Sequence, residues 1–332
     1  MNIIIDAFGG DNAPLEVILG SKKATENLED VHMILVGDED KIKSCAERNN
    51  IDLKGLEIVH TDSVIDICEE PTEIIKSKSN CSMAVGMKML AEGKGDAFIS
   101  AGSTGALVVG ATFIVKRIKG IKRTAIATML PTSNKPFLLI DAGANHDCRP
   151  EMLSQFGIMG SIYMDKIMHR RNPGVYLANI GTEESKGREL ELLTYNLLKD
   201  APINFCGNIE ARDLPNGDID VCVTDGFTGN MLLKMYEGMG KMMSRELKGM
   251  MTRNFFSKFG ALFMLSGIKG LKKKMDYSEY GGAPLLGIAR PVIKAHGSSN
   301  ANAFYHAILQ AKSFVEASVI EEISKSLKEM KV

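Results

Sequence analysis

Residues 97–115 read AFISAGSTGALVVGATFIV, and this uncharged stretch decides the fold class. Its first four residues are typical of a buried strand, and the polar segment from Ser100 to Gly105 ends that strand and opens a helix. A membrane span should be predominantly apolar along its whole length, which this stretch is not. We therefore expect a strand, a glycine-rich turn and a helix here, rather than a transmembrane segment.

Short apolar runs alternate with longer amphipathic segments on both sides of this stretch. Strands are expected at 3–6, 33–36, 56–59, 97–100, 124–129, 137–141, 174–179, 203–206 and 221–224, and helices at 15–28, 106–116, 152–168, 189–198 and, as one long final helix, about 300–328. This alternation predicts an α/β fold, a three-layer α/β/α sandwich around a mainly parallel sheet. We expect a single domain over residues 1–332, with a division into two lobes left open.

The composition excludes some classes of function. The net charge of −1 gives no global basic field, which argues against a nucleic-acid partner. The six cysteines form no C-x-x-C pair, and no cysteine–histidine cluster has zinc spacing, so no metal is expected. Scattered thiols suit a reducing compartment, and no signal peptide precedes the first strand. We therefore expect a cytoplasmic protein.

Polar, glycine-rich turns follow five of the predicted strands, at residues 6–11, 100–105, 141–145, 181–187 and 225–230. Ligands of open parallel sheets bind at the carboxyl ends of the strands, and free N–H groups at helix starts favour anions. Any one of these turns alone is more often a simple tight turn. We expect the five to share one sheet edge and to form a cleft for an anionic ligand. None matches a nucleotide phosphate-binding loop.

Two polar residues near these turns could perform chemistry. Lys186, in the glycine-flanked turn, could meet a phosphate or a developing oxyanion, or could be a solvated lysine paired with Glu183 or Glu184. His296, followed by Ser298 ahead of the final helix, could act as base, acid or phosphate donor, or as a cap or packing residue.

Another such pair flanks a predicted helix start. Asp225 and Asn230 stand on either side of this helix start and could have a functional role. The alternative is structural, with Thr228 or Asn230 capping the helix.

Residues 247–275 hold seven basic side chains and no acidic one, which indicates an insertion into the α/β body. Within it we expect 252–275 to form an amphipathic helical hairpin. Its apolar stripe is Phe255, Phe256, Phe259, Leu262 and Phe263, and its cations include Lys272 and Lys273. The apolar run is too short to span a bilayer, but it suits an anionic membrane surface. The alternatives are a core-facing helix pair and a dimer contact.

Eight ordered blocks of sequence together resemble one known family. They are residues 6–14, 100–106, 141–150, 179–187, 208–213, 225–230, 280–287 and 296–300. In these blocks the chain resembles the bacterial phosphate acyltransferases of phospholipid synthesis, which act on acyl-acyl-carrier-protein. It departs from the family at Phe8, Ser103 and Ala211, where methionine, asparagine and glycine are usual. A fainter similarity, centred on Ser185-Lys186-Gly187, points to the phosphotransacetylases.

The resemblance implies transfer of a fatty acyl group from an acyl-carrier-protein thioester to inorganic phosphate, with no cofactor or metal. The site residues it implies are Lys186 for phosphate or the oxyanion, His296 and Ser298 for phosphate or protons, Asp225 for orientation, and Ser103, Thr104, Gly105, Asn145 and Asn230 as phosphate-binding donors. The implied partners are the acyl carrier protein, a membrane-bound glycerol-3-phosphate acyltransferase and a second copy of the chain. Peripheral association with the membrane follows from the hairpin.

Three rival functions stay open. A coenzyme A-dependent phosphotransacetylase or phosphotransbutyrylase would not need a basic, phenylalanine-rich insertion. A decarboxylating dehydrogenase of the isocitrate type would need a carboxylate cluster for a metal, and none is evident. A non-enzymatic scaffold at the membrane surface would not need the polar turns.

Overall fold

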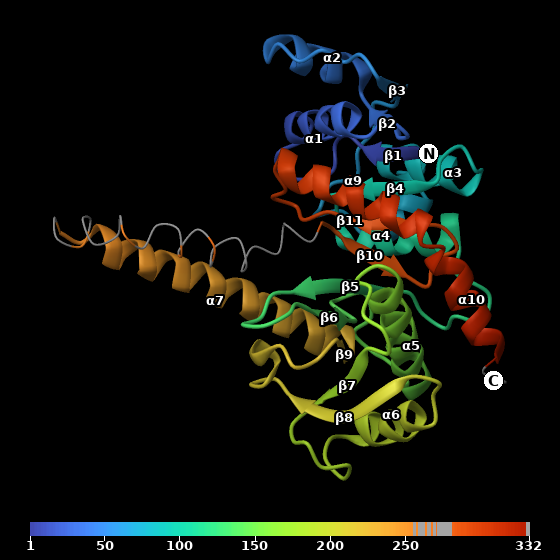
Figure 1. Ribbon diagram of the computed structural model, residues 1–332. Coiled ribbons are helices and arrows are strands. Elements are labelled where there is room, and N and C mark those ends of the chain that lie inside the picture. Colours follow the sequence, from blue (N-terminus) through green and yellow to red (C-terminus); the bar gives the residue numbers. More distant parts are fainter. Residues whose placement is uncertain (255–256, 258–262, 264–266, 268–269, 271–280, 330–332) are drawn as a thin grey trace.

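The computed structural model describes residues 1–254, 257, 263, 267, 270 and 281–329. Within these residues, eleven strands form one sheet in the order β3-β2-β1-β4-β11-β10-β5-β6-β9-β7-β8 (Figure 1). The strands are β1 (Asn2–Asp6), β2 (His32–Gly37), β3 (Leu56–His60), β4 (Ala97–Ser100), β5 (Ala125–Leu130), β6 (Phe137–Ile140), β7 (Gly174–Asn179), β8 (Asn204–Glu210), β9 (Val221–Val223), β10 (Ala283–Leu286) and β11 (Val292–Lys294).

Helices cover both faces of this sheet. They are α1 (Leu15–Asn27), α2 (Glu39–Arg48), α3 (Ser82–Ala91), α4 (Thr104–Gly110), α5 (Pro150–Lys166), α6 (Glu189–Lys199), α7 (Gly226–Thr252), α9 (Ala301–Glu316) and α10 (Val319–Glu329), with short turns η1 (Pro71–Ile75), η2 (Ala111–Val115) and η3 (Leu214–Asn216). One apolar cluster contains Phe98 and Leu107 together with Leu139 and Cys222, so a continuous core joins the two ends of the sheet. The predicted three-layer α/β/α sandwich is confirmed.

The sheet reverses direction at its centre. Seven of the ten strand pairs are parallel, as predicted, and the three antiparallel pairs are β11–β10, β10–β5 and β5–β6. Strands β3, β2, β1, β4 and β11 therefore run one way, and β6, β9, β7 and β8 run the other way. The turns after β1 and β4 lie at one edge, and those after β6, β7 and β9 lie at the opposite edge. The prediction of five turns on one edge was wrong.

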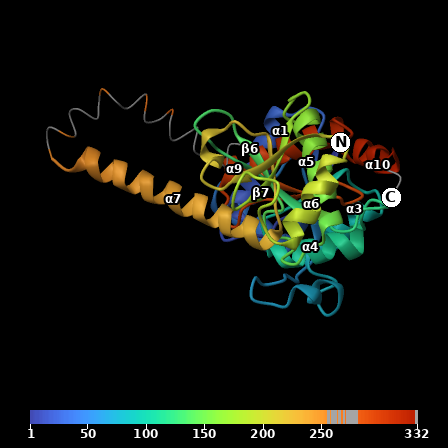
Figure 2. The same ribbon diagram turned by 90° about the horizontal axis from the view of Figure 1, so that it is seen from below.

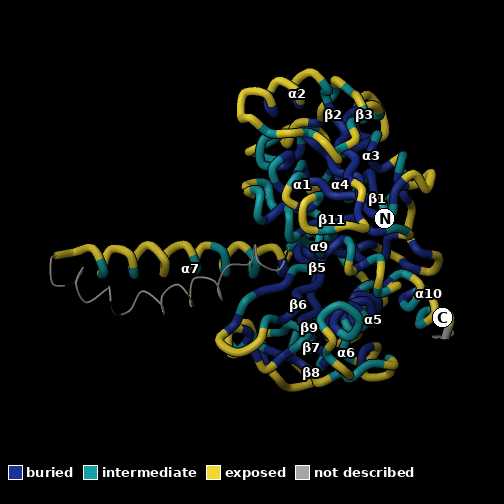
Figure 3. Tube along the Cα trace, turned by 45° about the horizontal axis from the view of Figure 1, so that its top comes forward, coloured by how far each residue is buried: buried dark blue, intermediate teal, exposed yellow. Residues whose placement is uncertain are grey.

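Two other predicted elements also differ. The final helix is two helices, α9 and α10, because the chain breaks at Ser318, whose φ is +50°. The predicted start of the insertion at 247 falls inside α7, which continues to Thr252 and projects from the body (Figures 1 and 2). Most of α7 is exposed, in contrast to the buried strands (Figure 3).

The predicted hairpin at 252–275 lies almost wholly outside the described residues, and so do Phe255, Phe256, Phe259, Leu262, Lys272 and Lys273. Among the helices that the structure describes, none is long and apolar enough to cross a membrane. The single-domain organisation and the hairpin stay predictions.

Candidate functional site

His296 lies two residues beyond β11 and contacts two different elements. Its Nδ1 accepts the backbone N–H of Ser298 at 3.2 Å and lies 2.9 Å from the Ser298 Oγ. Because Nδ1 accepts from a backbone amide, we assign the proton of the neutral ring to Nε2. Nε2 lies 3.8 Å from Oε1 of Glu237 on α7. The ring is therefore oriented between a serine hydroxyl and a carboxylate.

Lysines surround this histidine. Burial lowers the pKa of His296, the Glu237 carboxylate opposes this shift, and nearby Lys294, Lys234 and Lys241 reinforce it. A neutral imidazole among three lysines can accept a proton while the lysines attract an anion. A phosphate is the kind of ligand that such a group suits.

Lys294 is the most deeply held of these cations. Its ammonium donates to the carbonyl of Ala101 at 3.2 Å and also to the carbonyl of Ala295. Burial lowers the pKa of Lys294 to about 8, although Asp6 and Asp11 act in the other direction. A lysine with a perturbed pKa beside a polar turn is a candidate functional residue.

Asp6 fixes the turn that faces this lysine. Its carboxylate accepts from the hydroxyls of Ser82 and Ser100, both at 2.7 Å, and from the backbone N–H of Phe8 at 3.2 Å. Burial raises the pKa of Asp6, and these hydrogen bonds oppose the shift. Gly9 must be small, because a Cβ there would lie 2.7 Å from the backbone nitrogen of Gly102. The ends of β1 and β4 therefore pack directly together.

A second polar group lies at the opposite sheet edge, centred on Asp141. This buried carboxylate accepts four backbone N–H groups, from Ile126, Gly143, Ala144 and Asn145, together with the Asn145 side-chain amide. Burial raises the pKa of Asp141, while the hydrogen bonds lower it. The second hydrogen of the Asn145 amide goes to the Thr124 carbonyl at 2.6 Å. Both donors of Asn145 are thus used inside the protein.

Asp225 belongs to the same group and caps α7. It accepts the Thr228 N–H at 2.7 Å and pairs with Arg188 at 3.1 Å. The predicted alternative caps, Thr228 and Asn230, were wrong, because Asp225 itself is the N-cap. A cavity of about 240 Å³ adjoins it, lined by His146, Asp147, Cys148, Arg188, Leu190, Asp225 and Phe227.

One face of α7 joins the two groups. Asn230, Lys234, Glu237 and Lys241 recur at the spacing of one helical face. Asn230 lies against Gly143, where an added Cβ would be 3.4 Å from the Asn230 Cβ, and Glu237 contacts His296 and Lys234. Seven residues of helix span about 10 Å. The polar face of α7 therefore runs from the Asp141 group to His296.

The structure places the other predicted site residues in three different settings. Ser103 caps α4 by accepting from Ala106 N–H at 3.5 Å, Thr104 is exposed, and Gly105 packs against Pro71. Ser103 precedes α4, and Thr104 and Gly105 begin it, shortly after Ala101, whose carbonyl accepts from Lys294. Asn230 is exposed, and its amide makes no hydrogen bond within the described residues.

Lys186 is exposed in the 181–187 turn, far along the chain from the histidine. Its backbone carbonyl accepts from the Asn179 amide at 3.0 Å, and its ammonium forms no ion pair in the part of the chain that the structure describes. The predicted pairing with Glu183 or Glu184 is absent there, and Glu184 pairs with Lys199 at 3.6 Å. The role of Lys186 in the site therefore stays a prediction.

Sequence reasoning missed Lys294, Glu237 and Lys234. Lys294 ends the short strand β11, and its position two residues before His296 was the only available signal. Glu237 and Lys234 look like ordinary surface residues of a helix. Only the approach of α7 to His296, two residues beyond β11, gives Glu237 and Lys234 a role.

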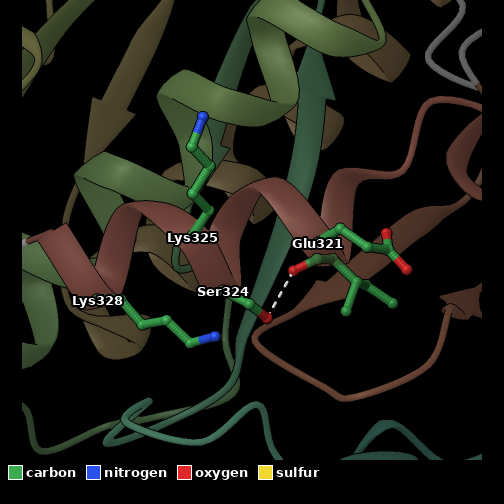
Figure 4. A pocket seen from close by; sticks show the side chains of 5 residues that line it. Glu321, Ser324, Lys325 and Lys328 are labelled. Atoms are coloured by element: carbon green, nitrogen blue, oxygen red, sulfur yellow. Dashed lines mark hydrogen bonds between the residues drawn. The ribbon is translucent and has the colours of Figure 1, made fainter.

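A larger cavity of about 550 Å³ lies along α10, lined by Ile320, Glu321, Ser324, Lys325 and Lys328 (Figure 4). The Ser324 hydroxyl donates to the Ile320 carbonyl at 2.8 Å, so it is used within the helix. None of the predicted site residues lines this cavity. Among the described residues, no group of three or more His, Cys, Asp or Glu side chains could hold a metal ion.

Comparison with known proteins identifies close relatives over nearly the whole chain. Residues 1–322 match the family described as fatty acid synthesis protein. The phosphate acyltransferase of Thermoanaerobacterium thermosaccharolyticum is 48% identical over 327 residues, which cover 98% of this chain and 97% of that protein. The phosphate acyltransferase of Clostridium acetobutylicum is 46% identical over 330 residues, which cover 99% of this chain and 100% of that protein.

Solved structures share the fold at low identity. A phosphotransacetylase from Streptococcus pyogenes superposes with a TM-score of 0.64 at 17% identity, over 97% of this chain and 94% of the other. The EutD phosphotransacetylase from Staphylococcus aureus gives a TM-score of 0.60 at 16% identity, over 96% of this chain and 94% of the other. At these identities the likeness concerns the fold alone.

Proposed function

Because the chain belongs to the fatty acid synthesis protein family, with phosphate acyltransferases among its relatives, we propose that it moves a fatty acyl group from acyl-carrier-protein thioester to inorganic phosphate. The product, an acyl phosphate, would serve phospholipid synthesis. The observation that carries the proposal is the placement of His296 between Ser298 and Glu237, with Lys294, Lys234 and Lys241 close enough to affect its charge. Such a group binds a phosphate dianion and can take its proton.

In the proposed reaction, a phosphate oxygen attacks the thioester carbon and the carbon–sulfur bond breaks. The proton of hydrogen phosphate passes to Nδ1 of His296 and then to the departing thiolate, so the products are acyl phosphate and free carrier thiol. The Ser298 hydroxyl, 2.9 Å from Nδ1, can relay this proton. Lys294 would neutralise the charge that develops on the phosphate and the carbonyl oxygen.

The groups on α7 would complete the site. Glu237, 3.8 Å from Nε2 of His296, favours the tautomer in which Nε2 carries the proton and Nδ1 does not. Asn230, one turn into the helix, has an uncommitted amide that can donate to phosphate. Lys186 is proposed for the oxyanion from the sequence resemblance. Asp225 would orient this part of the site indirectly, as the cap of α7.

The test is incubation with long-chain acyl-carrier-protein thioester and phosphate, with acyl phosphate trapped by hydroxylamine. We expect hydroxamate and free carrier thiol in equal amounts, and neither without phosphate. A parallel reaction with acyl-coenzyme A distinguishes a phosphotransacetylase. The proposal fails if hydroxamate does not exceed the enzyme-free control, or if coenzyme A thioester alone is used.

We also propose that the enzyme works at the membrane surface, since a long-chain acyl phosphate is poorly soluble and its acceptor would be a membrane-bound glycerol-3-phosphate acyltransferase. The support is the sequence of 252–275, outside the described residues. Wild type should float with anionic vesicles, more weakly at high salt, and Phe255→Asp/Phe259→Asp should not. Equal flotation of both proteins, or none of wild type, would contradict this.

A second copy of the chain is the remaining proposed partner. Phe227, Met231, Met235 and Met239 form an exposed stripe on the projecting helix α7, with 59%, 61%, 63% and 40% of their surfaces accessible. An apolar stripe of this length supports pairing of two α7 helices. Analytical ultracentrifugation should show a dimer for wild type and a monomer for Met231→Lys/Met235→Lys.

A further inference from the structure

Five basic side chains form a surface on the loop between η2 and β5. They are Lys116, Arg117, Lys119, Lys122 and Arg123, named here the 116–123 surface. All five are exposed, and none forms an ion pair within the residues that the structure describes. No acidic residue occurs between Asp96 and Asp141, and the whole chain has a net charge of −1. The surface is therefore a local concentration of uncompensated positive charge.

The loop that carries these charges is firmly anchored. Ile118 and Ile121 are each only 6% exposed, so the apolar residues of the loop point into the core. The Ile118 N–H donates to the Gly287 carbonyl at 3.0 Å, and Gln155 bonds to Lys122 N–H at 2.8 Å and to the Gly120 carbonyl at 3.0 Å. The charges are thus presented on a fixed scaffold, which lowers the entropy cost of binding a partner.

An exposed apolar side chain precedes the first of these charges by three residues. Phe113, in the turn η2, is 64% exposed. An exposed aromatic ring next to basic residues is typical of a protein interface, where the ring fills a pocket and the charges steer the partner. A membrane-binding segment would present a whole apolar face, whereas the two isoleucines of this loop are buried.

The surface adjoins the group centred on Asp141. Arg123 immediately precedes Thr124, whose carbonyl accepts from the Asn145 amide at 2.6 Å. Beyond Asn145 lie Cys148 and Asp225, which line the cavity of about 240 Å³. From there the polar face of α7 leads to His296. A partner seated on the 116–123 surface is therefore placed at one end of the proposed site.

We propose that the 116–123 surface docks the acidic carrier protein that presents the acyl thioester, an inference that rests on the proposed function. Clustered cations without carboxylate partners repel one another, and an acidic protein removes this repulsion while an aromatic anchor fixes its position. A flexible thioester-bearing arm then reaches the site from the docked carrier, along the polar face of α7.

The test compares Lys119→Glu/Lys122→Glu with a matched charge reversal on a different element, Lys325→Glu/Lys328→Glu on α10, where both lysines are also exposed (Figure 4). At low salt we expect the first variant to raise KM for acyl-carrier-protein thioester roughly tenfold, with kcat and KM for phosphate retained. High salt should reduce the difference. The α10 variant should behave as wild type. Lys119→Gln/Lys122→Gln provides a milder change should the reversal impair folding.

Direct titration of the carrier protein, without an acyl group, makes this test independent of catalysis. If wild type binds the carrier but forms no acyl phosphate, the proposed function fails while docking stands. If the 119/122 variants bind the carrier as wild type does and keep its KM, the docking proposal is overturned. Loss of vesicle flotation in those variants, with carrier binding unchanged, would assign the surface to lipid instead.

Discussion

Replacing Lys294 with methionine should remove most acyl transfer without destabilising the fold. The ammonium bonds to the Ala101 and Ala295 carbonyls and lies close to His296, so its loss removes a preorganised cation from the proposed phosphate site. Loss of one such donor typically lowers kcat about 100- to 1000-fold. Lys294→Arg, which keeps the charge, should retain more activity than the methionine variant.

The stability of this variant can be worked from the pKa of the lysine. Burial lowers that pKa from 10.5 to about 8, and each unit corresponds to about 1.4 kcal/mol, so the protonated amine costs the fold about 3 kcal/mol. Methionine removes this cost but also removes two hydrogen bonds, each contributing about 1 kcal/mol. At pH 7 the free energy of unfolding should therefore be about 1 kcal/mol higher than in wild type.

The pH dependence distinguishes this explanation from simple repacking. Between pH 8 and 10.5 the unfolded chain binds more protons at Lys294 than the folded chain does, so wild type gains stability from this group as pH rises. The advantage of Lys294→Met should accordingly shrink and then reverse. Denaturant unfolding at pH 7 and pH 10 measures both values. Near-wild-type turnover, or a loss of more than about 2 kcal/mol at pH 7, would refute the reasoning.

Three further substitutions test other parts of the site. Glu237→Gln removes the carboxylate that raises the pKa of His296, so the acid limb of the pH profile of kcat should move to lower pH. We also expect kcat to fall about tenfold. An unmoved acid limb would contradict the contact between Glu237 and His296. Asp225→Ala should cost about 1–2 kcal/mol in denaturant unfolding through loss of the α7 cap, and an unchanged midpoint would contradict the capping role. Lys186→Ala should lower turnover about 100- to 1000-fold and change the free energy of unfolding by less than about 1 kcal/mol; near-wild-type turnover would remove it from the site.

The fold class could be predicted because its signals are local. Strands such as β4 and β7 have apolar runs bounded by polar turns, and the structure places both at the predicted residues. Strands β10 and β11 were missed because they have only four and three residues, and Pro284 and Pro291 interrupt the pattern. These two strands begin the reversal of the sheet. The direction of a strand is set by its partners rather than by its residues, so the edge assignment failed.

The site was only partly predictable for a related reason. His296 and Ser298 stand in one short motif, and their contact is local. The contact between His296 and Glu237 depends on where α7 lies against the end of β11, which no short motif encodes. Lys294 has a low pKa because the surrounding fold buries it, and burial at the end of an unrecognised strand leaves no pattern in the sequence.

The hydrogen bonds of the polar turn residues show which of them stabilise the fold and which have a side chain still available to a ligand. The sequence predicts Asn145 as a phosphate-binding donor and Asp225 as a catalytic residue, and Asp141 begins one of the glycine-rich turns. In the structure their donors or acceptors are already used to hold the turn and the start of α7. The Asn230 amide, by contrast, makes no hydrogen bond within the described residues, and it lies on the α7 face that leads to His296. Asp141, Asn145 and Asp225 thus fix the position of the start of α7, and with it the Asn230 amide. Phosphate binding should depend on Asn230 more directly than on these three residues.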